Sequence, residues 1–334
     1  MHRILIIAPS WIGDMIMAQT LVALLRQQQQ DCHIDVLALP WIAPLLTRMP
    51  GVDGIIDMPV GHGKLGIGQR YHLGRSFRGR YDQAILLPNT LKSALIPLFA
   101  KIPKRTGFVG ETRYGLLNDI RKLDRQAMPK LVTRYASLAF DKGQALPDQV
   151  PYPVLQTSDA QVDDTLNSLS MQRPTHTVVG LCPGAEYGPA KRWPVEHYAA
   201  VANDVIENGG AVWLFGSKKD QEVTQAINQQ CNDRCIDLAG VTMLDQAIDL
   251  MSLTETIVTN DSGLMHVACA LGRKVIAIYG SSSPQYTPPL SDDAHIVSLN
   301  LECSPCFERE CPLGHLDCLK KLTPDQVTYA MGEF

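Results

Sequence analysis

The chain has 334 residues, of which 45% are hydrophobic and 19% are charged, and its formal net charge is −4. This length suits two domains, and the apolar content excludes a disordered chain. The slightly acidic balance argues against general nucleic-acid binding, which shows as a basic excess.

The first half of the chain predicts short apolar strands that alternate with amphipathic helices. Strands are expected over residues 3–9, 34–39 and 81–87, and a helix over residues 14–28. The opening apolar run is too short for a signal peptide, and no run approaches the ~18 residues of a membrane span. We therefore expect a cytoplasmic protein.

The second half restarts the same alternation. Strands are predicted over residues 177–182, 211–215, 255–259 and 274–278. Helices are predicted over residues 194–208, 219–231 and 244–253, and a last one begins at Thr323. Alternating strands and helices imply an α/β fold with parallel sheets covered on both faces.

A polar, proline-bearing stretch separates the two halves. It predicts an N-terminal domain over residues 1–155, a C-terminal domain over residues 172–320 and a C-terminal helix over residues 321–334. Open parallel sheets bind ligands beyond the carboxyl ends of their strands. With two such sheets, the cleft between the domains is the expected site.

The loop after the first strand ends in Gly13 and Asp14. Gly13 allows a tight turn into the helix. Asp14 at the helix start is either an N-cap or a catalytic base, and its position alone does not separate the two. No G-x-G-x-x-G follows any predicted strand, which argues against a dehydrogenase.

Two loops of the second domain carry candidate ligands for a nucleotide. One runs from Cys182 through Gly184 to Lys191, just before a helix, and suits a diphosphate. The alternative is a solvated loop with surface cations. In the other, Asp220 is either a ribose ligand or a plain helix cap.

A third loop, over residues 259–266, follows a strand and opens a helix. Ser262 and Gly263 offer donors at the helix N-terminus, where an anion is stabilised. Because a second anion there would be repelled, we expect Asp261 to bind sugar hydroxyls. His266 lies one turn into the helix, and a lone histidine there is more often structural.

Four cysteines form a cluster with the spacing C-x2-C-x4-C-x6-C, at Cys303, Cys306, Cys311 and Cys318. They could supply four thiolates to zinc, but the second C-x2-C of paired zinc knuckles is missing. The alternative is a loop of reduced cysteines, since a disulfide scaffold is improbable in a cytosolic chain of this size. We assign no metal ligand from sequence.

These segments resemble the ADP-heptose:lipopolysaccharide heptosyltransferases, most closely the branch that adds the second heptose of the inner core. The resemblance lies in residues 7–14, 113–119, 182–194 and 260–266, and so spans both domains. It implies a GT-B fold, with two Rossmann-like domains facing each other across a cleft. The N-terminal domain then receives the acceptor and the C-terminal domain holds the ADP-sugar.

The resemblance implies an inverting glycosyltransferase that moves L-glycero-D-manno-heptose from ADP-heptose onto the heptosylated Kdo-lipid A core. Asp14 is then the general base and Lys191 the cation on the diphosphate. The implied donor-binding residues are Gly184, Asp220, Thr242, Asp261, Ser262, Gly263 and His266. No D-x-D motif is present, so no cofactor is expected, although a divalent metal could assist.

The implied acceptor is anionic, and the first domain is well supplied with cations to meet it. They are Lys64, Arg70, Arg75, Arg78, Arg80, Lys92, Arg105, Arg113, Arg121 and Lys122. Among these we take Lys92 and Arg113, together with Gly13, as acceptor-binding. A lipid acceptor also implies peripheral contact with the cytoplasmic face of the inner membrane, and no nucleic acid is expected.

Three other functions stay open from sequence. They are a different heptosyltransferase step (heptose I or III), a GT-B nucleotide-sugar epimerase and a non-catalytic nucleotide-binding regulator. The presence of both Asp14 and Lys191 argues against the regulator. The epimerase would turn over nucleotide sugar without a lipid acceptor.

Overall fold

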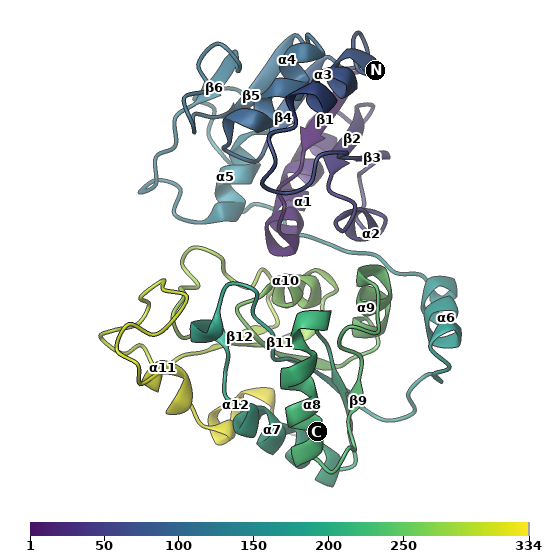
Figure 1. The fold of residues 1–334 in the computed structure, drawn as a ribbon, viewed down its shortest axis with the longest axis vertical. Coiled ribbons are helices and arrows are strands. Elements are labelled where there is room, and N and C mark those ends of the chain that lie inside the picture. Colours follow the sequence, from purple (N-terminus) through teal and green to yellow (C-terminus); the bar gives the residue numbers. More distant parts are fainter. Residues whose placement is uncertain (333–334) are drawn as a thin grey trace. The chain divides into compact units, whose positions relative to one another are not determined.

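The computed structural model describes residues 1–332 and divides the chain into two compact units that meet between Val154 and Leu155 (Figure 1). Each unit has its own parallel sheet and its own hydrophobic core. The α/β fold class with two Rossmann-like domains is therefore confirmed. Across residues 1–332, no helix combines the length and the apolar character needed to cross a membrane.

The first unit is built on a parallel sheet with the strand order β3-β2-β1-β4-β5-β6. Its strands are β1 (Arg3–Ile7), β2 (His33–Ala38), β3 (Gly54–Asp57), β4 (Gln83–Leu86), β5 (Lys104–Phe108) and β6 (Asp119–Arg121). This is the order of a dinucleotide-binding fold, in which the first three strands extend the sheet to one side of β1 and the strands from β4 onward extend it to the other side. Ligand-binding loops are expected between β1 and β4, where the direction of this extension reverses.

Helices pack on this sheet in two pairs, α1 with α5 and α3 with α4 (Figure 1). The helices of the unit are α1 (Ile12–Gln28), α2 (Ala43–Leu46), α3 (Ile67–Ser76), η1 (Leu91–Ala94), α4 (Leu95–Phe99) and α5 (Leu131–Ser137). Apolar residues cover most of α1, and they are buried from Met15 to Leu25 with few interruptions. The helix is thereby fixed over the strand that precedes it.

Strand β3 was not predicted, and the expectation that no G-x-G-x-x-G follows a strand is therefore wrong. The run Gly61-His62-Gly63-Lys64-Leu65-Gly66 follows β3, and α3 begins at Ile67. A G-x-G-x-x-G therefore does lie between a strand and a helix. However, β3 is the edge strand, far from the reversal between β1 and β4. The dinucleotide fingerprint belongs at the turn after the first strand, so the run does not indicate a dehydrogenase.

The second unit repeats the topology of the first, with the strand order β12-β11-β10-β7-β8-β9. Its strands are β7 (Val178–Cys182), β8 (Ala211–Leu214), β9 (Ile236–Asp237), β10 (Thr256–Asn260), β11 (Lys274–Ile278) and β12 (Ala294–Val297). Here the direction reverses between β7 and β10, which pair in parallel. The loops that follow these two strands therefore come together.

The helices of the second unit include two that lie outside the predicted C-terminal domain of residues 172–320. Its helices are α6 (Asp159–Ser168), η2 (Pro189–Lys191), α7 (Val195–Glu207), η3 (Lys218–Asp220), α8 (Gln221–Gln230), α9 (Leu244–Met251), α10 (Gly263–Ala270), α11 (Asp317–Lys320) and α12 (Pro324–Met331). Helix α6 packs on α9, and α12 places Val327 and Met331 in the core. The predicted end of the last helix at Phe334 lies outside the described residues.

Candidate functional site

The predicted donor residues of the second unit lie on neighbouring loops, each at the carboxyl end of a strand of its sheet. Thr242 follows β9, Asp220 follows β8, Lys191 follows β7 and Asp261 follows β10. Since neighbouring strands are about 4.8 Å apart, the loops form a row that spans roughly 10–15 Å. Such a row can hold an elongated ligand with chemically different ends.

Lys191 and Asp261 form a buried ion pair at the reversal point of the sheet. The Lys191 ammonium lies 2.5 Å from an Asp261 carboxylate oxygen, and the side chains are 17% and 6% exposed. The ammonium also lies over the ring of Tyr187, 5.1 Å from its centroid. The alternative of a solvated loop with surface cations is therefore wrong for Lys191.

Asn260 fixes the loop that carries Lys191 at both of its ends. Its side-chain amide donates to the carbonyl oxygen of Pro183 (2.7 Å), where the loop begins. Its side-chain oxygen accepts from the backbone N–H of Trp193 (3.1 Å), where the loop ends, and from the Tyr198 hydroxyl (3.0 Å). Because Asn260 directly precedes Asp261, these bonds bring Lys191 to its partner.

We expect Asn260→Ala to destabilise the protein by about 3 kcal/mol, because it leaves several buried polar groups without partners. Urea unfolding measures the loss. Asn203→Ala is the matched control, because Asn203 is only partly buried and bonds Arg234 and Gln230 near the surface. Equal stabilities of the two variants would show that Asn260 does not anchor the loop.

Helix α10 begins at the same point of the sheet. Its N-cap is Ser262, followed by Gly263, and both are partly exposed. His266 lies in the next turn, and burial lowers its pKa to about 4, so the ring is neutral at pH 7. Its Nδ1 has no hydrogen-bond partner among the described residues. A helix N-terminus beside a lysine and a neutral imidazole favours a bound anion with hydroxyl groups nearby.

Asp220 and Gly184 contact each other across the ends of β8 and β7. The Asp220 carboxylate accepts from the backbone N–H (2.9 Å) and hydroxyl (2.7 Å) of Ser217, which closes a capping box. Asp220 is thus the third residue of a capping box on Ser217 and does not cap α8 with its side chain, so the plain helix-cap interpretation is wrong in that form; its ribose role stays a prediction. A Cβ on Gly184 would lie 2.5 Å from the same carboxyl group, so only glycine fits there. The Thr242 hydroxyl donates to the carbonyl oxygen of Leu238 (3.1 Å).

Two residues in the next loop of the row were not predicted. Ser281 and Ser282 follow β11, the strand beside β10, and both side chains are buried. Their hydroxyls have no hydrogen-bond partner within residues 1–332. The rule that pointed to the other loops, polar groups just after a parallel strand, applies equally to this loop.

In the first unit, Asp14 lies in the first turn of α1. The N-cap is Trp11, whose indole has no acceptor for a capping bond, so the N-cap interpretation of Asp14 is wrong. Burial raises the pKa of Asp14 to about 6. The expected turn at Gly13 is also wrong, because Gly13 is helical and the turn is made before Ile12. Asp14 is thus a partly buried carboxylate with raised basicity, after the first strand.

Arg113 is fully buried, so it is not placed for the direct acceptor contact that we predicted. Its guanidinium donates to the carbonyl oxygen of Pro88 (2.8 Å) and to the hydroxyl of Ser93 (3.1 Å). Burial lowers its pKa to about 10, so it stays charged at neutral pH. Arg113 therefore holds the loop after β4, which leads to the partly exposed Lys92. Of the other predicted cations, Arg70 and Arg121 are also buried.

Comparisons with known proteins agree with one another. Residues 70–317 match the family model of glycosyltransferase family 9 (heptosyltransferase). The chain is 49% identical over 337 residues to lipopolysaccharide heptosyltransferase 2 of Escherichia coli K12, covering 97% of this chain and 96% of that protein. It is 50% identical over 308 residues to lipooligosaccharide heptosyltransferase 2 of Haemophilus influenzae, covering 89% and 88%. The solved structure of E. coli ADP-heptose lps heptosyltransferase II matches with a TM-score of 0.88 at 46% identity, covering 98% and 97%.

Proposed function

The chain belongs to glycosyltransferase family 9, the heptosyltransferases, and we propose that it transfers L-glycero-D-manno-heptose from ADP-heptose onto the heptosylated Kdo-lipid A inner core of lipopolysaccharide. The family makes it a transferase. The choice of the second heptose step comes from the full-length relatives named heptosyltransferase 2.

The observation that carries the proposal is the row of loops on the second unit. Adenosine is assigned to the end near Thr242, after β9, and the ribose to Asp220, after β8. The diphosphate then reaches Lys191 and the N-terminus of α10, where positive charge and helix dipole meet. Asp261 and His266 are left for the sugar, because they follow β10, the next strand of the sheet beyond the strand that precedes Lys191.

We expect a crystal structure with ADP to show the nucleotide on the second unit, in this orientation. The diphosphate should lie within hydrogen-bond distance of Lys191 and of Ser262 or Gly263, and the adenosine near Thr242. A nucleotide seated on the first unit would contradict the assignment. So would a reversed orientation, with adenine at α10.

The proposed reaction is a displacement with inversion at the anomeric carbon. The acceptor hydroxyl forms the new bond to that carbon while the bond to the ADP oxygen breaks, through an oxocarbenium-like transition state. Asp14 takes the proton of the hydroxyl, and its raised pKa makes it a stronger base than an ordinary carboxylate. Lys191 and the α10 N-terminus stabilise the negative charge that develops on ADP.

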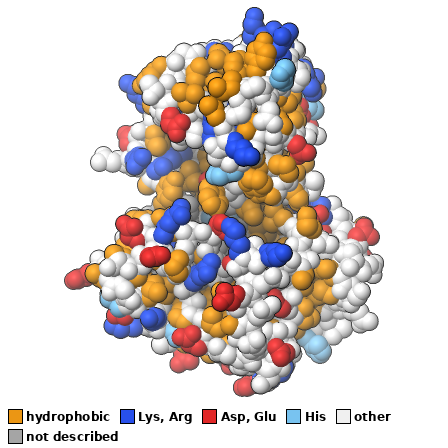
Figure 2. Space-filling model, in the orientation of Figure 1, with side chains coloured by type: hydrophobic (Ala, Val, Ile, Leu, Met, Phe, Trp, Pro, Cys, Tyr) orange, Lys and Arg blue, Asp and Glu red, His pale blue; other side chains and the backbone are white. Residues whose placement is uncertain are grey.

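The surface of the first unit supports a lipid acceptor and peripheral contact with the cytoplasmic face of the inner membrane. Trp11, Trp41, Ile67 and Tyr114 are 53%, 48%, 55% and 63% exposed. Figure 2 shows hydrophobic side chains on this unit with Lys and Arg side chains among them. Indole and phenol rings suit the interface between lipid and water, and the cations suit anionic headgroups.

One assay separates this proposal from the alternatives. Purified core lipids carrying zero, one or two heptoses are each incubated with ADP-heptose. We expect transfer to the lipid with one heptose; preference for the others would indicate the heptose I or III step. Consumption of ADP-heptose without any lipid would indicate an epimerase, and no turnover at all a regulator.

A further inference from the structure

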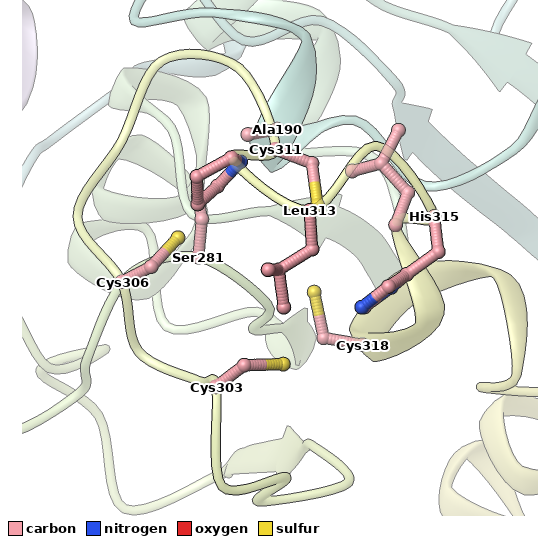
Figure 3. A pocket seen from close by; sticks show the side chains of 10 residues that line it. Ala190, Ser281, Cys303, Cys306, Cys311, Leu313, His315 and Cys318 are labelled. Carbon is pink, nitrogen blue, oxygen red and sulfur yellow. The ribbon is translucent and has the colours of Figure 1, made fainter.

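Four cysteines and a histidine line one small pocket in the second unit. Cys303, Cys306, Cys311, Cys318 and His315 surround a cavity of about 20 Å³ (Figure 3). Three of the cysteines are partly exposed, Cys318 is buried, and all four are free thiols. The pocket has no assigned role in heptose transfer.

Most of the cysteines lie in a long irregular segment that has no helix or strand to stabilise it. Residues 298–316, between β12 and α11, contain no regular helix or strand. Loops of this length without secondary structure are uncommon in a compact domain, and they usually have a function. Three of the thiols lie along this segment, and the fourth, Cys318, lies in α11.

We propose that this pocket binds one Zn²⁺ ion through the thiolates of Cys303, Cys306, Cys311 and Cys318. Zinc prefers four tetrahedral ligands and is well satisfied by four cysteines, and binding releases the thiol protons to solvent. Within residues 1–332, the side chains do not already stand at coordinating distances. Figure 3 shows the Cys303 and Cys318 sulfurs close together and Cys306 to one side, so the loop around Cys306 closes on binding.

The segment touches two loops of the donor row, which gives the ion a structural purpose. The Tyr187 hydroxyl donates to the carbonyl oxygen of Phe307 (2.6 Å), and the Phe307 N–H donates to that of Ser281 (2.7 Å). The Ala190 N–H donates to the carbonyl oxygen of Arg309 (3.0 Å). A metal ion in the pocket would fix this segment and, through these hydrogen bonds, stabilise the loop that carries Lys191.

Elemental analysis of the untagged protein, purified without chelators, tests the proposal directly. We expect about one zinc per chain in the wild type and less than a tenth of that in Cys303→Ser/Cys306→Ser. The control Cys32→Ala/Cys269→Ala removes two cysteines far from the cluster in sequence and should keep its zinc. The cluster variant should melt at a lower temperature, because the segment that contacts the loop of Lys191 loses its metal ion.

A second measurement covers the case in which zinc is lost during purification. Co²⁺ added to the reduced, metal-free protein should give a sulfur-to-cobalt charge-transfer band, and the cluster variant should not. Absence of both zinc and this band would overturn the proposal, as would a disulfide within the cluster found by mass spectrometry. Neither readout involves heptose transfer, so this proposal and the proposed function can fail separately.

Discussion

Replacing Asp14 with asparagine is expected to lower kcat by about 10²–10⁴-fold, the usual contribution of a positioned general base. The acceptor hydroxyl is a poor nucleophile until its proton is accepted, and an amide cannot accept it. ADP binding should be unchanged, because the proposed nucleotide site lies wholly on the second unit. Asp31→Asn is the matched control, since Asp31 is exposed and lies beyond the opposite end of α1.

The same substitution should change stability in a pH-dependent way. The pKa of Asp14 is about 6 in the folded protein against an ordinary value of 3.8, so folding favours the protonated form. The stability that this group contributes is complete below pH 4 and is lost as the pH rises through 6. Asp14→Asn should therefore match the wild type near pH 4 and exceed it by up to about 3 kcal/mol at pH 8.

The pH dependence of the rate gives a further check on Asp14. The wild-type kcat/KM should fall below about pH 6, as the base becomes protonated. His266, with a pKa of about 4, does not titrate in this range, so we attribute the fall in rate near pH 6 to Asp14. An asparagine variant with wild-type rates would show that Asp14 is not the base.

Lys191→Ala is expected to lower kcat by about 10²–10³-fold, because the ammonium stabilises charge that grows on the departing ADP. The variant also leaves Asp261 buried without its partner, which typically costs about 3–5 kcal/mol of stability. A loss of activity alone would therefore not separate a catalytic role from a structural one.

The double variant Lys191→Ala/Asp261→Asn, compared with Asp261→Asn alone, separates the two roles. It removes the unpaired charge, so most of the lost stability should return while kcat stays low. Recovery of both would make Lys191 a purely structural residue. Lys219→Ala is the matched control, because Lys219 is an exposed lysine of the neighbouring loop, paired with Glu186; its rate should equal that of the wild type.

The central strands of both sheets were predictable because they are almost continuously apolar, as in β1 and β7. The missed strands lack that signal for identifiable reasons. β3 and β12 are half exposed at sheet edges, β9 has only two residues, and β5 begins with Lys104 and Arg105. Their strand structure comes from pairing with neighbours, which a sequence window does not contain.

The site was predicted in part, for a similar reason. Polar residues just after strands identified Lys191 and Asp261 separately, but their ion pair joins positions 70 residues apart. The role of Asn260 as an anchor also depends on distant partners. Arg113 was misread because composition shows a cation but not its burial, and only the fold shows that protein groups already occupy its guanidinium.

The arrangement of the donor row separates two kinds of recognition onto different segments of chain. In the proposed complex, the loop after β9, around Thr242, contacts the adenosine, whereas the loops after β7 and β10 contact the diphosphate and the sugar. Mutations in the first loop can therefore alter the choice of nucleotide while the catalytic charges stay in register. Evolution can therefore change the nucleotide of the donor while the residues of the transfer reaction stay the same. For the same reason, a redesign of donor specificity would begin with residues 238–243.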